Sequence, residues 1–444
     1  MSKEKSGLNR REFLAAGAAA GATLMMPNIM RAAQVNNSND LRIGMIGTGA
    51  EGLVLIDAAL KIPGIRFVAV CDIWADWNRK RAARTLLKFG HPVNEYLDYQ
   101  EMLANEKDMD AVIVATPDFW HHTHAIASME AGLDVYCEKE MSNTLANARK
   151  MVETSRRTGK LLQIGHQRRS NPRYIHTYDH VLQEANLLGR MTTINAQWNR
   201  AVSPDLGYPK KYPVPPEILR QYGYKNMHQF RNWRWYKGLG GGAIVDLGSH
   251  QIDIFSWFTG TNPSTVWASG GTDYYDKETH EWYDTVQTLW EYQTQQGMVR
   301  AFYQTITTNS NQGYYEAFMG DQATLLISES ASRGAVYREA ANPETPLWDK
   351  WVQKGIILPP SGTQQTQGTD VRETVPAEEY KINKPFDDPY HMPHLVNFFN
   401  AMRGEEELNC PGKTGYETAV AVLKVNDAVR TRQMQSFTKD EFHV

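Results

Sequence analysis

The sequence predicts an α/β fold, in which a doubly wound parallel sheet is followed by a second domain of largely antiparallel strands. A strand-length apolar run at 41–46 leads directly into a glycine-rich turn and a helix-forming stretch. Four more apolar runs alternate with helical segments as far as about residue 165, which is typical of parallel strands joined by crossover helices. Residues 264–328 instead contain consecutive segments that alternate polar and apolar side chains, which favours antiparallel pairing.

The composition excludes several classes of protein. Of the 444 residues, 41% are hydrophobic and 22% charged, so a chain that is disordered throughout is excluded. Lys and Arg total 47 and Asp and Glu total 50, a net charge of −3 that gives no electrostatic reason to expect a nucleic-acid partner. The three cysteines are too far apart and too few for a disulfide framework. Beyond the N-terminus no apolar run approaches the roughly 20 residues that span a bilayer, so we expect no membrane-embedded segment.

Residues 1–35 have the features of a twin-arginine export signal and its leader. Arg10 and Arg11 precede Phe13 and Leu14, and a weakly apolar stretch rich in Ala and Gly continues to about Met30. The alternative is a frayed amphipathic helix. We expect export by the twin-arginine route, with the periplasm as the destination.

The turn after the first strand has the spacing of a dinucleotide-binding loop. Gly47, Gly49 and Gly52 form G-x-G-x-x-G between strand and helix. In such a loop the first glycine allows the tight turn, the second lets the backbone approach the pyrophosphate, and the third lets helix and strand pack closely. The helix N-terminus then offers N–H donors and a partial positive charge to the phosphates. Thr48 and Ala50 belong to the same turn and are predicted cofactor contacts.

Asp72 ends the second strand, 25 positions after Gly47. Its carboxylate is expected to accept hydrogen bonds from the adenosine ribose and to repel a 2′-phosphate, which favours NAD over NADP. Arg79 or Lys80 could nevertheless receive a phosphate. Further reactive segments stand where later strands end, at 116–122, 138–140 and 166–169, and ligands of such sheets bind at the carboxyl ends of the strands.

The chain resembles the Gfo/Idh/MocA oxidoreductases from about residue 40 to the C-terminus, most strongly over 41–260. The resemblance is carried by LRIGMIGTGAEG, ATPDFWHHTHA, AGLDVYCEKEMS, QIGHQRRSNP and GGGAIVDLGSHQIDIFSW. It implies a Rossmann domain that binds NAD over 40–165 and a substrate-binding domain with a largely antiparallel open sheet over 166–444. Members typically oxidise or reduce sugars, inositols and related polyols, so the resemblance also implies a carbohydrate substrate and a homo-oligomer, either a dimer or a tetramer.

The resemblance assigns roles to individual residues. Lys139 matches the active-site lysine of the E-K-P motif, in which Glu138 is a cofactor contact together with the lysine. Asp246 and His250 match the acid/base pair of the second motif. The segment along the nicotinamide-side ribose is matched by Thr116, Pro117 and His121. The chain departs from the family where Glu140 replaces the usual proline, which loosens Lys139 and adds a carboxylate beside it.

Hydride transfer needs a base for the hydroxyl proton and a positive or donor group for developing alkoxide charge. Lys139 can supply the second. Asp246 and His250 are four residues apart and would share one helix face, and a histidine titrates near neutrality. Asp253, one turn further on, is expected to support His250 from behind. The alternative for His250 alone is a hydrogen-bonded histidine of the core.

Substrate contacts are expected mainly from an aromatic, proline-rich segment. Residues 198–236 have no clean helical or strand period, and a long irregular segment in an enzyme is usually functional. The predicted substrate-binding residues are Arg168, Trp198, Trp233, Arg234 and Tyr236. The alternative is a loop that packs on the sheet or on a second subunit. The closely spaced His121, His122 and His124 lack obvious partner ligands, so no metal site is predicted.

Three functions follow from these residues. The first is an NAD-dependent oxidoreductase acting on a carbinol of a sugar or glycoside. The second is an NAD-dependent enzyme that cleaves glycosides by oxidation, elimination, hydration and re-reduction; the chain lacks the glycine–histidine motif associated with the N-acetylgalactosaminidase members. The third is a non-catalytic sugar or nucleotide sensor, against which intact Lys139, Asp246 and His250 argue. Some exported members of the family hold their nucleotide tightly, and the signal found here is compatible with that behaviour.

Overall fold

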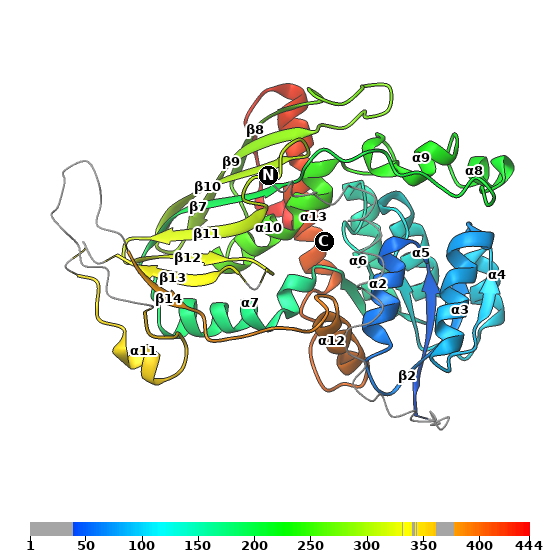
Figure 1. Ribbon diagram of the computed structural model, residues 1–444, viewed down its shortest axis with the longest axis horizontal. Helices are drawn as coiled ribbons and strands as arrows, with labels where there is room; N and C mark the ends of the chain where they lie inside the picture. Colours follow the sequence, from blue (N-terminus) through cyan, green and yellow to red (C-terminus); the bar gives the residue numbers. More distant parts are fainter. Residues whose placement is uncertain (1–38, 331, 340–341, 343, 361–376) are drawn as a thin grey trace, which may run out of the picture. The chain divides into compact units, whose positions relative to one another are not determined.

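The computed structural model describes residues 39–330, 332–339, 342, 344–360 and 377–444. Both predicted sheets are present in this part of the chain, and Figure 1 shows their strands. The twin-arginine segment and leader, residues 1–35, lie outside the described residues. No described helix combines the length and apolar character that crossing a bilayer requires.

Six strands form the first sheet in the order β3-β2-β1-β4-β5-β6, and all its neighbours are parallel. Because the order reverses between β1 and β4, the crevice at their carboxyl ends is where such sheets bind ligands. The sequence analysis missed β3, whose three exposed or half-buried residues form no apolar run. The strands are β1 (Leu41–Ile46), β2 (Ile65–Cys71), β3 (Asn94–Tyr96), β4 (Ala111–Val114), β5 (Asp134–Cys137) and β6 (Leu162–Ile164). The helices that accompany them are α2 (Ala50–Ala59), α3 (Lys80–Lys88), α4 (Tyr99–Asn105), α5 (Asp118–Glu130) and α6 (Leu145–Thr158).

Nine strands form the second sheet in the order β14-β13-β12-β11-β7-β10-β9-β8-β15. All its neighbours are antiparallel except β7 and β10. β14 is an edge strand of this sheet, in which Tyr380 alone is buried. The strands are β7 (Met191–Asn199), β8 (Thr265–Gly271), β9 (Thr285–Thr294), β10 (Gly297–Ile306), β11 (Tyr314–Gly320), β12 (Ala323–Ile327), β13 (Gly334–Arg338), β14 (Glu378–Lys381) and β15 (Gln435–Ser436). The short helices of this half are α7 (Pro172–His176), α8 (Pro216–Gln221), α9 (Met227–Arg231) and α11 (Asp349–Gln353).

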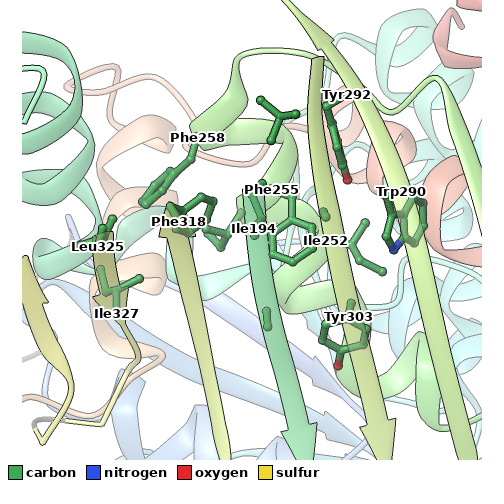
Figure 2. Packing of buried hydrophobic residues seen from close by; sticks show 14 of the residues in the cluster. Ile194, Ile252, Phe255, Phe258, Trp290, Tyr292, Tyr303, Phe318, Leu325 and Ile327 are labelled. Atoms are coloured by element: carbon green, nitrogen blue, oxygen red, sulfur yellow. The ribbon is translucent and has the colours of Figure 1, made fainter. Parts of the chain in front are cut away.

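Helix α10 (Ala243–Thr259) is anchored to the second sheet by aromatic packing. Phe255 and Phe258 of α10 lie against Phe318 of β11, with ring centroids 6.1 and 5.0 Å apart (Figure 2). Tyr303 of β10 lies edge-on to Phe255. This core fixes the helix that carries Asp246 and His250, which are on one face of it as predicted.

Helices α12 (Met392–Met402) and α13 (Gly412–Thr431) complete the hydrophobic core of the first sheet. Phe398 of α12 belongs to the same buried cluster as Ile43 of β1. Val420 of α13 belongs to the cluster that contains Val114 of β4. The division of the chain into 40–165 and 166–444 stays a prediction, and the packing shows that the later segment helps to build the earlier one.

Candidate active site

A cavity of about 680 Å³ lies at the carboxyl ends of the parallel strands, within the size range of ligand pockets. One end is lined by Gly47, Gly49 and Asp72 of the first sheet. The other end is lined by Lys139, Asp246 and His250. The two sets of residues that the sequence predicted separately, a dinucleotide site and a reactive site, therefore share one cavity.

The glycine turn leaves room for a ligand at the backbone. Gly47 has φ +88°, and a Cβ there would lie 2.6 Å from the backbone of Ala115. A Cβ at Gly52 would lie 2.2 Å from the carbonyl oxygen of Gly47, so this glycine serves the packing of helix α2 on the turn. A Cβ at Gly49 would meet its nearest neighbour, Asn78, only at 3.8 Å. These residues fit a dinucleotide whose pyrophosphate lies at the N-terminus of α2, where Ala50 also lines the cavity.

Asp72 lines the cavity and also holds the turn. Its carboxylate accepts hydrogen bonds from the N–H groups of Thr48, at 2.8 Å, and Trp74, at 2.7 Å. Burial raises the pKa of Asp72, and these two hydrogen bonds oppose that rise. Thr48 is fully buried and does not line the cavity. Thr48 was predicted to contact the cofactor, but in the structure it donates hydrogen bonds to Asp72 and so supports that residue.

On the reactive side, Thr116, Pro117 and Glu138 line the cavity as expected. His121 does not, because its ring lies between two backbone carbonyls, with Nδ1 2.7 Å from the oxygen of Glu140 and Nε2 2.6 Å from that of Thr116. Burial lowers its pKa to about 4, so the ring is neutral and donates one hydrogen bond at a time. His121 is thus a residue that supports the turn and not a cofactor contact.

Lys139 and Asp246 meet at the reactive end. The Lys139 Nζ donates to the Asp246 carbonyl oxygen at 2.5 Å and to its Oδ1 at 3.2 Å, and the Arg234 Nε donates to the same Oδ1 at 3.1 Å. Burial alone would raise the pKa of Asp246, but the Arg234 and Lys139 cations hold it well below its usual range. Asp246 is therefore ionised at neutral pH and orients the ammonium group of Lys139.

His250 stands one helical turn after Asp246. It is 7% exposed, and its ring lies 5.5 Å from that of Trp198 and 6.4 Å from that of His166. Burial lowers the pKa of His250 well below its ordinary value, and the positive charge of Lys139 lowers it further. The expectation of titration near neutrality is wrong. At pH 7 the ring is a neutral imidazole, a form that can accept the proton of an alcohol.

Asp253 and Glu140, which lie near Lys139, Asp246 and His250 in the sequence, have partners that the sequence did not predict. Asp253 accepts hydrogen bonds from Arg169 Nε and from Thr418 Oγ1, each at 2.9 Å, so the expectation that it supports His250 is wrong. Glu140 is 1% exposed and accepts the Met141 N–H at 2.8 Å; its peptide bond to Lys139 is cis. Burial raises the pKa of Glu140 to about 8.

Of the predicted substrate contacts, Trp198, Trp233 and Arg234 line the cavity, whereas Arg168 and Tyr236 do not. Arg168 is 1% exposed and forms ion pairs with Glu316 and, at 2.9 Å, with Glu329. The Tyr236 hydroxyl is 2.9 Å from Nδ1 of His228. Both corrections have the same cause, because each side chain is already held by polar partners of the protein.

The sequence analysis missed other lining residues. Tyr314 lies opposite Trp198 in the pairing of β11 with β7, and their rings stack 4.7 Å apart. Gln167 belongs to the segment 166–169, where only Arg168 was chosen. Glu329 also lines the cavity. The position of Gln167 after β6 was a usable signal, but Tyr314 and Glu329 reach the site only through the pairing of distant strands.

The irregular segment 200–240, here called the crossing segment, forms one wall of the cavity. The Trp74 indole N–H donates to the Tyr212 carbonyl at 2.6 Å, and the Trp120 indole N–H donates to the Tyr222 carbonyl at 3.1 Å. The segment's own apolar side chains, among them Tyr224, form a buried cluster with Trp74. Trp74, which follows β2, and Trp120, in the first turn of α5, therefore fasten this segment over the Asp72 end of the cavity.

One group in the described ranges brings three possible metal ligands together. Donor atoms of Glu51, Glu138 and His391 lie within 4.8 Å of one another. His391 Nε2 is 3.2 Å from Glu51 Oε1. Burial and the charge of Glu51 raise the pKa of Glu138 to about 8. The expectation of no metal site stays a prediction.

Comparison with known proteins identifies the class to which this fold and site belong. A model described as "Oxidoreductase family, NAD-binding Rossmann fold" matches residues 41–166, and one described as "GFO/IDH/MocA C-terminal domain" matches residues 181–325. The chain belongs to the Gfo/Idh/MocA family of oxidoreductases.

Curated relatives match parts of the chain. The rhizopine catabolism protein MocA of Rhizobium meliloti is 28% identical over 225 residues, 50% of this chain and 58% of the relative. A glycosyl hydrolase family 109 protein of Stenotrophomonas maltophilia is 34% identical over 158 residues, 34% of each chain. The inositol 2-dehydrogenase of Salmonella typhimurium is 34% identical over 137 residues, 30% of this chain and 39% of the relative. Each match spans less than two thirds of the relative.

Solved structures share the whole fold at low sequence identity. An oxidoreductase domain protein from Kribbella flavida is 19% identical with a TM-score of 0.66, covering 90% of this chain and 100% of its own. The WlbA dehydrogenase from Bordetella pertussis, solved with NADH and UDP-GlcNAcA, is 19% identical with a TM-score of 0.62, covering 90% and 99%. The sheet order described above is therefore a shared architecture.

Proposed function

We propose that this protein is an NAD-dependent oxidoreductase that transfers a hydride between nicotinamide and a carbinol of a sugar or glycoside. The observation that carries the proposal is the single cavity in which the glycine turn and Asp72 face Lys139, Asp246 and His250. Named relatives include an inositol 2-dehydrogenase, whose substrate is a polyol.

The chain's own residues account for binding and proton transfer. Gly47, Gly49 and the N-terminus of α2 would hold the pyrophosphate, and Asp72 the ribose. When bound, NAD supplies the hydride acceptor. The ammonium group of Lys139, oriented by Asp246, stabilises alkoxide charge on the substrate oxygen. The neutral His250 accepts the hydroxyl proton. Trp198 offers an aromatic face to the apolar side of a sugar ring.

NAD is proposed over NADP on electrostatic grounds. Asp72 lines the cavity, whereas Arg79 and Lys80, the two candidate phosphate receptors, do not. Arg79 pairs with Glu95 at 3.2 Å, and Lys80 pairs with Asp76. We also propose that the nucleotide is held tightly, because the crossing segment covers the Asp72 end of the cavity. Release from that end would require the hydrogen bonds of Trp74 and Trp120 to this segment to break.

The alternative is cleavage of a glycoside through a transient keto-sugar, with the hydride returned in the same cycle. Two observations favour it: the crossing segment over the nucleotide end, and the resemblance to a glycosyl hydrolase family 109 protein. A nucleotide that stays bound can be reduced and reoxidised without exchange, so an enclosed cofactor suits a cycle that is redox-neutral overall.

One assay distinguishes the two functions. The purified protein, without added nucleotide, is mixed with a panel of glycosides and free sugars, and reduced-nicotinamide absorbance and aglycone release are followed together. A stable rise in absorbance without aglycone release identifies a dehydrogenase. Aglycone release over many turnovers, with at most a transient rise, identifies the cleavage cycle. If denaturation releases bound NAD but neither signal appears with any substrate, the proposal of a sugar oxidoreductase fails.

Export and oligomer formation are proposed on separate grounds. Arg10 and Arg11 support a twin-arginine route to the periplasm, and family membership supports a homodimer or homotetramer. Replacing both arginines by lysine should keep the protein in the cytoplasm of the source cell, as measured by cell fractionation. Sedimentation of the purified protein reports the oligomer.

A further inference from the structure

The wall behind His250 contains buried polar atoms without a hydrogen-bond partner among the described residues. They are Nδ1 of His250, both ring nitrogens of His166, Oε1 of Gln167 and Nη2 of Arg168. The four residues are 7%, 1%, 6% and 1% exposed. Buried polar groups are nearly always hydrogen-bonded, and an unpaired one costs about 1–3 kcal/mol, so these atoms indicate a polar partner such as a buried water.

The fold itself brings these atoms together. His166 stands two residues after the end of β6, and Gln167 and Arg168 open the short 3₁₀ helix η2 (Gln167–Ser170), which contacts α10. Gln167 Nε2 donates to Glu329 at 3.1 Å, and Arg168 Nε donates to the same carboxylate at 2.9 Å. The amide and guanidinium groups are thus held at one end while Gln167 Oε1 and Arg168 Nη2 remain unpaired.

The distance between the two imidazoles excludes a direct bond. Their ring centroids are 6.4 Å apart in an edge-to-face arrangement. Even with two nitrogens aimed at each other, the nitrogens would be at least about 4 Å apart, beyond the ~3 Å of a direct hydrogen bond. A link between the two rings therefore needs a bridging group, and a buried water, which typically makes about three hydrogen bonds, can serve as one.

We propose that His166 is a positioning residue, which holds a buried water against Nδ1 of His250 and thereby fixes the tautomer of that catalytic ring. This proposal rests on the proposed function and assigns the proton-accepting role to Nε2 of His250, because His250 lines the cavity and Nδ1 is its buried, unpaired nitrogen. Nε2 can accept only if Nδ1 carries the hydrogen, and Nδ1 needs an acceptor to keep it. Oxygen of the bridging water is that acceptor, and His166, Gln167 or Arg168 completes its coordination.

The test reads the tautomer directly, and it does so without substrate. The full-length protein, with its copurified nucleotide, is labelled with ¹⁵N-histidine, and the His250 signal is identified by its loss in His250→Gln. We expect the wild-type ring to be the Nδ1–H form. In His166→Phe, which fills the space with an apolar ring, we expect the Nε2–H form to appear and kcat to fall about tenfold with KM nearly unchanged.

Two further variants separate positioning from damage to the fold. His166→Asn keeps a polar side chain and should retain more activity than His166→Phe. His176→Gln, a half-buried histidine outside the cavity whose Nε2 is 2.9 Å from the Ile356 carbonyl, should change neither the tautomer nor kcat. If His166→Phe does not fold, as judged by circular dichroism, the tautomer of His250 in the wild-type protein is the remaining test of the proposal.

An Nε2–H tautomer in the wild-type protein overturns the proposal, and so does an unchanged tautomer in a folded His166→Phe. These results concern the resting protein. They therefore stand apart from a failure of the proposed function, which would appear as an Nδ1–H tautomer in a protein that oxidises no sugar or glycoside.

Discussion

Two ion networks of similar chemistry adjoin the cavity, and they differ in how deeply their side chains are buried. Arg168, Glu316 and Glu329 form the inner network, with side chains 1%, 0% and 4% exposed. Lys139, Asp246 and Arg234 form the outer network, with side chains 12%, 19% and 46% exposed. The inner carboxylates are held by Arg168 and, at Glu316, also by the Tyr174 hydroxyl.

The difference separates stability from reactivity. An ion pair buried in the interior is strongly destabilising to break, because removal of one partner leaves an uncompensated charge. A solvent-exposed pair contributes about 0–1 kcal/mol to stability, and the outer network, whose side chains are 12% to 46% exposed, is nearer to that limit than the inner one. The inner network should therefore matter to folding, and the outer one, whose ammonium and guanidinium groups keep free donors toward the cavity, should matter to turnover.

The largest expected effect is on turnover at Lys139. Lys139→Ala should lower kcat about 1,000-fold or more, because the group that stabilises alkoxide charge is lost. The thermal midpoint should shift little and the copurified nucleotide should remain, as measured by scanning calorimetry and by release on denaturation. Lys413→Ala, at an exposed pair with Glu417, is the matched control. A variant of Lys139 that retains wild-type turnover contradicts its assigned role.

Arg168→Met should have the second largest effect, which we expect on the stability of the fold. Leaving Glu316 and Glu329 buried without their cation is expected to lower the free energy of unfolding by about 3–5 kcal/mol, measured by urea titration. Arg430→Met removes the cation of an exposed pair with Asp427 and should leave the urea midpoint unchanged. Equal midpoints for the two variants would remove the distinction between the networks.

The pH dependence of stability at Glu140 is a third test of the comparison between the two networks. Glu140 is as buried as the inner network, but it is adjacent in sequence to Lys139 of the outer one. Its pKa in the folded protein is about 8, raised chiefly by burial, against about 4.3 for an unfolded chain. The folded state therefore binds more protons between these values, and stability falls as pH rises through that window.

Glu140→Gln should remove this dependence. The variant is expected to gain about 1–3 kcal/mol over wild type between pH 5 and pH 8, measured by urea titration at several pH values. Glu405→Gln, an exposed control, should follow the wild-type curve. A Glu140→Gln curve parallel to wild type would mean that Glu140 is ionised in the folded protein.

Arg234→Gln should have the smallest effect. Its side chain is 46% exposed, so stability should change little. Turnover should fall about tenfold, equivalent to 1.4 kcal/mol, because one cation beside Asp246 is lost. With that cation gone, the pKa of Asp246 should rise toward its usual value, which moves the acid limb of the kcat/KM profile to higher pH. Arg300→Gln on β10 is the control. An unmoved acid limb would exclude coupling between Arg234 and Asp246.

Local patterns in the sequence predicted the first sheet and the cofactor end of the cavity. The glycine turn, Asp72 and the strand ends are adjacent in sequence to the strands that position them, so spacing alone located them. The same reasoning placed Asp246 and His250 on one helix face. The short exposed strand β3 gave no such signal, because it contains no apolar alternation.

The substrate end was predicted less well, for a physical reason. Arg168 and Tyr236 are residue types that bind sugars. The sequence does not show that Arg168 forms an ion pair with Glu316, or that the Tyr236 hydroxyl is hydrogen-bonded to His228. Tyr314 and Glu329 reach the cavity through strand pairings between distant segments. The type of each residue is known from the sequence. Whether its side chain faces the cavity or a partner from a distant segment depends on the complete tertiary structure.

The packing of α12 and α13 under the first sheet has a consequence for biosynthesis. Strands β1 and β4 leave the ribosome hundreds of residues before Phe398 and Val420, which share their hydrophobic clusters. Domains fold as units while a chain emerges, yet this unit keeps exposed apolar surface until its C-terminal helices arrive. Capture of the nucleotide is therefore expected only after translation has passed residue 431, and an unfinished chain is expected to need a chaperone until then.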